Sequence, residues 1–270
     1  MSHQRTLDEI ITNFLLNTCR LRPQISEHVI QAAALCAEVE NRHLLDDEEG
    51  DVIPLITGSV AEFYIAPILP HIGDVDVMLH SCTLLAIPRG HPPPTQLPAE
   101  FSGYVYVFKI DDSHLPGYVY LELLYLLTYC TDDDKYNYIE YDSGQRLANW
   151  LYQPEGDSRN RHGPALLRDF SRTSFSNVDV VYCVRCLSWP SQAADWPTRH
   201  RNHDWPDSAT VDHVVNNGCD VVGIAHRQCR QDKWMGECQW RLSFSRAEIV
   251  LINSWMPVQQ GLFITCYEFS

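Results

Sequence analysis

A short segment near residue 75 alternates carboxylates with apolar side chains, and it restricts the fold more than any other part of the chain. It reads Asp74-Val75-Asp76-Val77-Met78-Leu79. Successive side chains of a β-strand point to opposite faces, so the segment predicts a strand with both carboxylates on one side and valines toward a core. Two carboxylates so close together resist joint ionisation. A hard divalent cation between them, Mg²⁺ or Mn²⁺, would remove that repulsion.

A Gly-Ser pair precedes this strand. Thr57-Gly58-Ser59 follows the strand-like segment Val52–Thr57 and comes before residues 60–65, which could begin a helix. A turn of this kind lets backbone N–H groups approach a phosphate closely, and the helix N-terminus adds partial positive charge. The interval up to Asp74 leaves room for one helix and a return to the next strand. The two features together favour a metal-assisted phosphate site over an ordinary turn and a solvent-facing edge strand.

A third carboxylate is needed if two metal ions act together, one of them activating an attacking hydroxyl. Asp179 is the best candidate, because it lies in the apolar strand-like segment Val178–Cys186 with hydrophobic neighbours on both sides. Asp142 and Asp169 lie in more polar surroundings and are weaker candidates.

The rest of the pattern indicates an α+β protein. Apolar residues at helical spacing predict two N-terminal helices before Pro23 and after Ser26, followed by an acidic linker at residues 46–51. Besides the segments already named, residues 104–110 read as a strand, and residues 118–128 read as a strand or a buried helix. We expect a mixed sheet with a helical N-terminal brace.

The net charge and the distribution of cysteines exclude some classes of protein. A formal net charge of −15 argues against a surface coated for nucleic-acid binding, which depends on Lys and Arg. The local basic candidates are the Arg199-His200-Arg201 run and a cluster of Arg227, Arg230 and Lys233. The 10 cysteines are scattered through apolar segments and do not form a disulfide framework. No signal peptide or membrane-spanning stretch is evident, so we expect a cytoplasmic protein without a membrane partner.

Two further motifs suggest other kinds of site. His226 and Cys229 have a zinc-like spacing, but a second tight pair is absent. His213, Cys219 and Cys238 are the other residues considered for zinc. Three Trp-Pro pairs, beginning at Trp189, Trp196 and Trp205, read as a structured surface loop, with a base-stacking platform as the alternative. No Gly-x-Ser-x-Gly elbow of a serine hydrolase is present.

Several of these segments together resemble a known family. They are Gly58-Ser59, Asp74-Val75-Asp76-Val77-Met78, Val178-Asp179-Val180 with Ser188-Trp189-Pro190, and Trp240-Arg241-Leu242-Ser243-Phe244-Ser245. They are similar to the male-abnormal-twenty-one (Mab-21) family, which includes cyclic GMP-AMP synthase and the cGAS-like receptors of animals. The similarity covers roughly residues 55–254, and the last block is its most specific part. It implies a bilobed nucleotidyltransferase fold with an N-terminal spine (1–50) and a core (51–254). The helical C-terminal lobe of the family is expected to be largely absent here, with residues 255–270 as its truncated start or a divergent tail.

The resemblance also implies an activity and a set of site residues. The activity is metal-dependent nucleotidyl transfer that makes a cyclic dinucleotide from ATP and/or GTP in innate immune signalling, with a double-stranded nucleic acid as activator. Asp74, Asp76 and Asp179 would hold two Mg²⁺ or Mn²⁺ ions. Thr57, Gly58 and Ser59 would bind the phosphates, and Arg241 and Ser243 would lie near a nucleobase. The alternatives are a catalytically silent scaffold of the same family and a nucleic-acid-binding protein.

Overall fold

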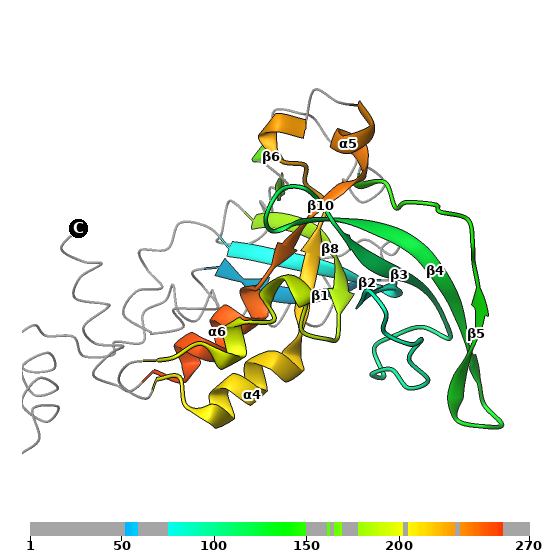
Figure 1. Cartoon of the computed structure of the whole chain (residues 1–270), viewed down its shortest axis with the longest axis horizontal. Coiled ribbons are helices and arrows are strands. Elements are labelled where there is room, and N and C mark those ends of the chain that lie inside the picture. Colours follow the sequence, from blue (N-terminus) through cyan, green and yellow to red (C-terminus); the bar gives the residue numbers. More distant parts are fainter. Residues whose placement is uncertain are drawn as a thin grey trace, which may run out of the picture.

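The computed structural model describes residues 52–58, 75–149, 161–162, 165–168, 178–201, 205–229 and 233–255. These residues form one large mixed sheet with helices packed beside it (Figure 1). The α+β class expected from the sequence is therefore confirmed. The predicted spine helices (1–50), the segment 60–65 and the tail after residue 255 lie outside the described residues, and so does Asp169.

The predicted strands are found, and those at residues 75–79, 104–110 and 118–128 are longer than expected. Val52–Thr57 (β1) and Val178–Cys186 (β8) have the predicted bounds, and the ambiguous segment 118–128 is a strand. The bounds of the remaining strands are β2 (Val75–Pro88), β3 (Tyr104–Asp112), β4 (Tyr118–Cys130), β5 (Lys135–Glu140), β6 (Arg161–His162), β7 (Ala165–Arg168), β9 (Cys219–Val222) and β10 (Gln239–Ser243). The helices among the described residues are α4 (Ser208–Asn217), α5 (Lys233–Cys238) and α6 (Ser245–Asn253), with short 3₁₀ turns η5 (Ser191–Ala193), η6 (Trp196–Thr198) and η8 (Arg227–Cys229).

Six of the strands close into a ring. The order β2-β3-β4-β10-β9-β8 returns to its start, because β8 also pairs with β2. The contacts of β2 with β3 and with β8 are parallel, and the other contacts around the ring are antiparallel. β1 extends the sheet beside the first half of β2, and β7 does so beside the first half of β8. The ring therefore has an inner face and an outer face.

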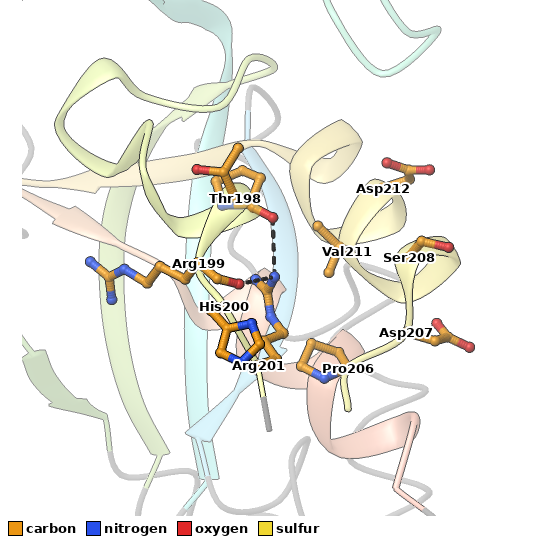
Figure 2. A pocket seen from close by; sticks show the side chains of 10 residues that line it. Thr198, Arg199, His200, Arg201, Pro206, Asp207, Ser208, Val211 and Asp212 are labelled. Atoms are coloured by element: carbon orange, nitrogen blue, oxygen red, sulfur yellow. Dashed lines mark hydrogen bonds between the residues drawn. The ribbon is translucent and has the colours of Figure 1, made fainter. Parts of the chain in front are cut away.

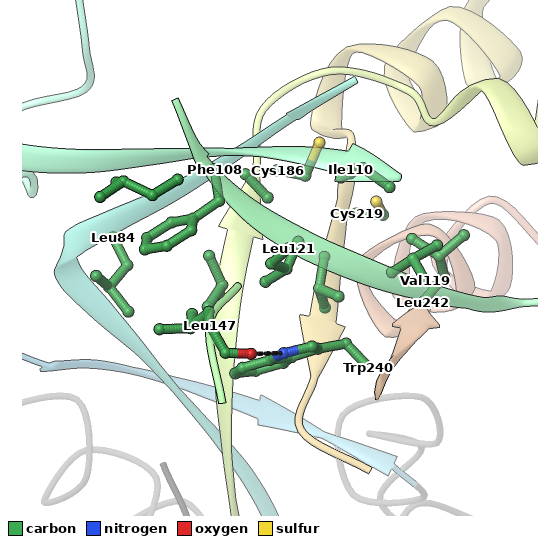
Figure 3. Packing of buried hydrophobic residues seen from close by; sticks show 14 residues of the cluster. Leu84, Phe108, Ile110, Val119, Leu121, Leu147, Cys186, Cys219, Trp240 and Leu242 are labelled. Carbon is green, nitrogen blue, oxygen red and sulfur yellow. Dashed lines mark hydrogen bonds between the residues drawn. The ribbon is translucent and has the colours of Figure 1, made fainter. Parts of the chain in front are cut away.

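The inner face is filled by apolar side chains from all six strands. Trp240 of β10 is fully buried there, and its indole N–H donates a 2.9 Å hydrogen bond to the backbone oxygen of Leu147 (Figure 3). The other members of this core alternate along their strands with residues of the outer face. They are Leu84, Ala86, Phe108, Ile110, Val119, Leu121, Leu123, Leu147, Val184, Cys186, Cys219, Val221 and Leu242.

The helices α4 and α6 pack against each other, and α6 contacts β1 and β9 (Figure 1). α4 begins where the Asp207 carboxylate accepts a 2.7 Å hydrogen bond from the Thr210 N–H, a typical N-cap. Val211 and Val214 form its buried stripe. None of the helices in the described segments has the length and hydropathy needed to cross a membrane.

Candidate functional site

Two of the predicted carboxylates lie on neighbouring strands in direct register. Asp76 of β2 pairs with Asp179 of β8 in a parallel ladder. Paired residues of a ladder point to the same face, and adjacent strands are about 4.8 Å apart, so these carboxylates are close neighbours. The face is the outer one, because Met78, two residues after Asp76, packs with Cys183 and Val222 there. Asp74 lies just before the described part of β2, so its position is not part of this geometry.

The end of β1 approaches the same carboxylate from the other side. Thr57 is the register partner of Asp76 and is buried. The next residue, Gly58, has φ of +65°, and a Cβ built on it would lie 2.0 Å from Asp76 Oδ2. Only a glycine backbone leaves room for the carboxylate in this position. Thr57, Gly58, Asp76 and Asp179 therefore form one cluster across three strands, and Ser59 lies outside the described residues.

We expect Gly58→Ala to lower activity about 10- to 100-fold, because the added methyl group must displace the Asp76 carboxylate and a 1 Å misplacement of a reacting group has an effect of this order. The measurement is the rate of the nucleotidyl transfer predicted from the sequence, assayed with nucleoside triphosphate and the purified variant. Gly90→Ala is the matched control, since Gly90 also has positive φ (+80°) but has nothing within 4 Å of its added Cβ. Equal activity of the two variants would show that the contact between Gly58 and Asp76 is unimportant.

The predicted base-side residues lie on β10 and share the outer face. Arg241 pairs with Val222, which pairs with Cys183 of β8, and the Arg241 side chain is exposed. Ser243 Oγ lies 4.0 Å from Met78 Sδ and 3.2 Å from Ser245 Oγ. Ser243 is thus next to Met78, which follows Asp76 on the same face of the sheet. Along β8, the row of Arg241 is four residues from Asp179, about 13 Å at roughly 3.3 Å per residue.

A buried ion pair that the sequence analysis missed lies beside Ser243. Asp220 of β9 is fully buried and accepts a 2.8 Å hydrogen bond from Arg246 Nε at the start of α6. Its register neighbours are Ser243 and Arg185. The sequence does contain a signal for it. Arg185 and Asp220 are single charged residues inside apolar segments, and buried charges of this kind are normally paired.

Arg185 links the same strands to α4. Its guanidinium donates hydrogen bonds to the backbone oxygens of Cys186 (2.9 Å), Cys219 (2.8 Å) and Asn217, the last residue of α4. Burial lowers the pKa of Arg185, and the Asp220 charge partly opposes that effect. Burial also raises the pKa of the nearby Cys183 thiol, with a further contribution from Asp220. On the outer face, Arg185 and Asp220 are thus buried neighbours, and Arg246 reaches Asp220 from α6.

The Trp-Pro region forms a separate open cavity of about 670 Å³, which the loop at residues 197–201 and the start of α4 line (Figure 2). Arg201 bonds the backbone oxygens of Pro197 and Arg199 and stacks over the Trp196 ring. Arg199 pairs with Asp195 at 2.9 Å. Arg199 and Arg201 therefore bind to groups of their own loop. This does not favour the interpretation of the basic run as a nucleic-acid site.

The tryptophan rings of this region contact other rings of the same chain. Trp189 packs against Trp196 (5.4 Å between centroids) and against Phe244 (5.3 Å), and Trp205 packs against Trp255 (6.3 Å). This arrangement agrees with a structured loop and leaves the base-stacking alternative without support from the geometry.

The structure also gives no support to the hypothesis of a zinc site at His226 and Cys229. His226 Nδ1 accepts a hydrogen bond from the Gln228 N–H at 3.3 Å, and its ring lies edge-on to Tyr118 at 5.1 Å. Across the described ranges, no group of three or more His, Cys, Asp or Glu residues is arranged to hold a metal ion. The carboxylate cluster is not tested by that finding, because Asp74 is not among the residues described.

Comparison with protein families supports the geometric reading. Residues 145–254 match the model of the Mab-21 protein nucleotidyltransferase domain. The resemblance to the Mab-21 family is thereby confirmed. The matched segment contains Asp179, Arg241 and Ser243, together with the buried pair of Asp220 and Arg246. Thr57, Gly58 and Asp76 lie before it, and β1 and β2 bring them to the Mab-21 segment through the pairing with β8.

Proposed function

We propose that this protein is a nucleotidyltransferase that uses Asp74, Asp76 and Asp179 to act on a nucleoside triphosphate, ATP and/or GTP. The observation that carries the proposal is the direct register of Asp76 with Asp179, with the Gly58 backbone against the Asp76 carboxylate. The match of residues 145–254 to a nucleotidyltransferase domain supports the same reaction class.

The donor set fits hard divalent cations. Carboxylate oxygens on two paired strands repel one another, and Mg²⁺ or Mn²⁺ prefers such oxygens together with substrate phosphates. Two bound ions would neutralise the triphosphate and lower the pKa of the attacking hydroxyl. Asp74, Asp76 and Asp179 would hold them, and the tight approach of Gly58 fixes the Asp76 carboxylate in place.

The roles of the chain's own residues are those that the sequence resemblance implies. The backbone at Thr57, Gly58 and Ser59 would receive the β- and γ-phosphates, and Arg241 and Ser243 would contact the base. A ribose hydroxyl oxygen then attacks the α-phosphorus, the bond to the bridging oxygen breaks, and pyrophosphate leaves as the hydroxyl proton passes to solvent. Positioning and charge neutralisation supply most of the rate enhancement in such chemistry.

The specific product we propose is a cyclic dinucleotide, made in innate immune signalling as in cGAS-like receptors, with a double-stranded nucleic acid as activator. The support is the sequence resemblance around Gly58, Asp76, Asp179 and the block from Trp240 to Ser245. The net charge of −15 restricts an activator to a local basic surface.

Labelled ATP and GTP provide the test. The purified chain is incubated with both nucleotides and Mn²⁺ or Mg²⁺, with and without duplex RNA or DNA, and products are separated after phosphatase treatment. We expect a phosphatase-resistant product that disappears with a chelator and in the double variant Asp76→Asn/Asp179→Asn. Product that persists in the double variant would refute the assignment of these residues. Absence of product under every condition would favour the silent scaffold.

A further inference from the structure

The exposed large apolar side chains of the described residues gather on one part of the molecule. They lie on β3, β4 and β5, in the hairpin that projects away from α4 and α6 (Figure 1). We call residues 104–107 of β3, 125–130 of β4 and all of β5 the wing. The five side chains are Tyr104, Tyr106, Tyr129, Tyr138 and Ile139. An apolar concentration of this kind indicates an interaction surface.

The two faces of the wing differ in how they are covered. On one face, Val105, Val107 and Leu127 are fully buried beneath Phe101 and neighbouring residues of the preceding loop. The opposite face carries the row Tyr106–Leu126–Ile139, whose members are register partners across the three strands. Ile139 is 60% exposed and Tyr106 37% exposed. In the described part of the chain, this second face has no covering element.

The register explains why an apolar face is left open. Tyr104 and Tyr106 continue the alternation of Phe108 and Ile110, which fill the inside of the ring. An irregularity in the β3–β4 pairing at Val107 separates the wing from the ring. On the wing side of Val107, the strands β8, β9 and β10 do not lie opposite β3. Tyr104 and Tyr106, which would otherwise point into the ring, are therefore exposed. The wing therefore presents a core-like face without its partner strands.

The outer edge of β5 is also open for part of its length. Tyr136 N–H donates to the Thr95 oxygen at 2.9 Å, so the backbone groups of Tyr136 point away from β4. Those of Tyr138 and Glu140 must point outward as well, because the pattern repeats every second residue. Within the described segments their N–H groups have no backbone partner. The open edge thus offers hydrogen-bonding groups next to exposed Tyr138 and Ile139.

The charges around this edge argue against pairing with a second copy of the chain. Asp132, Asp133 and Asp134 precede β5, and Glu140 and Asp142 lie at its other end. Lys135 already pairs with Asp133 at 3.2 Å. An antiparallel copy would place the acidic turn of one chain opposite the acidic end of the other, and such like-charge contacts are destabilising. A strand with basic ends would meet opposite charge at both ends.

We propose that the open edge at Tyr138 and Glu140 binds an extended segment of a partner protein by strand addition. The segment carries apolar residues in alternation, which pack on the face formed by Tyr104, Tyr106, Leu126 and Ile139. Lys or Arg flanks this apolar part on both sides. In strand addition, backbone hydrogen bonds supply affinity and alternate side chains supply specificity. This function is separate from the nucleotidyl transfer proposed above, because no residue of the wing is among the proposed metal, phosphate or base contacts.

The test uses the full chain and a synthetic peptide in which valine alternates with threonine between Lys-Arg ends. We expect the peptide to slow amide hydrogen exchange at Tyr138 and Glu140 by about tenfold or more. The same peptide with glutamate ends should bind at least about tenfold more weakly, and added salt should reduce this difference. Tyr138→Pro should weaken binding by about tenfold or more, because it removes an outward N–H without removing a β4–β5 hydrogen bond.

Tyr138→Phe is the matched control, since it keeps both the ring and the N–H, and it should bind the peptide as the original chain does. The proposal is overturned if the basic-ended peptide leaves exchange at Tyr138 and Glu140 unchanged, or if Tyr138→Pro binds it equally well. It is also overturned if the chain sediments as a dimer that Tyr138→Pro dissociates, because the occupant of the edge is then a second copy.

Discussion

Asp179→Asn should lower the rate of nucleotidyl transfer roughly 10³-fold or more while the protein stays folded. Asp179 and Asp76 are register partners, so removing one carboxylate removes half of the negative charge that the described strands direct at the proposed triphosphate site. Bound metal ions stabilise the charge of the transition state by several kcal/mol. A loss of about 4 kcal/mol corresponds to roughly a thousandfold in rate. Single-turnover assays with saturating Mn²⁺ and ATP or GTP measure the effect.

The stability of the same variant gives a second, independent result. Like charges at paired strand positions destabilise the metal-free fold, so Asp179→Asn should leave the free energy of unfolding within about 1 kcal/mol of the original value or raise it. Asp142→Asn is the control variant, because Asp142 is an exposed carboxylate and a weaker metal candidate. It should retain full activity. If Asp142→Asn loses activity and Asp179→Asn keeps it, the third carboxylate has been misassigned.

The local parts of the fold could be predicted from the sequence. Alternation of apolar residues gave the bounds of β1 and β8 and located β2 and β3, because a two-sided strand leaves a period-two pattern in its own residues. The same reasoning indicated that Asp76 and Asp179 lie on apolar strands. It did not indicate α4, although Asp207 is an N-cap and Val211 and Val214 follow at helical spacing.

The pairing of distant strands could not be predicted in this way. The ring depends on contacts such as β4 with β10, where Tyr118 meets Arg241, and no local pattern specifies such a partner. The strands β9 and β10 are also too short to show a clear period. The face shared by Asp76, Arg241 and Ser243 therefore became visible only with the register of the whole sheet.

The packing of Gly58 against Asp76 shows the same limit on a smaller scale. The sequence marked Gly58 as a residue that lets phosphate approach the backbone. The structure adds a second reason for glycine, because the Asp76 carboxylate itself occupies the space of a Cβ. One glycine thereby connects the predicted phosphate turn to a predicted metal ligand, a relation that depends on the β1–β2 register.

Arg246→Met should lower the free energy of unfolding by about 3–5 kcal/mol, whereas Asp220→Asn should lower it by less. Removing one partner of a buried pair leaves an uncompensated charge, and that penalty is of this size. The two changes differ because Asp220 is fully buried, while the Arg246 side chain is 18% exposed and can turn toward solvent when its partner is neutral. Urea denaturation followed by tryptophan fluorescence measures both values, provided that the slope with denaturant stays the same.

Arg199→Met is the matched control, since Arg199 and Asp195 also form a 2.9 Å pair but their side chains are 61% and 67% exposed. This change should lower the free energy of unfolding by less than about 0.5 kcal/mol, because exposed pairs of this spacing contribute little.

The double variant Asp220→Leu/Arg246→Met should lower the free energy of unfolding by less than the sum of the two single variants, since neither charge is then left alone. Because Ser243 pairs with Asp220 and precedes α6, Arg246→Met should also raise the KM for nucleotide more than it lowers kcat. A small loss for Arg246→Met, equal to that of Arg199→Met, would mean that the pair does not anchor α6 to the sheet.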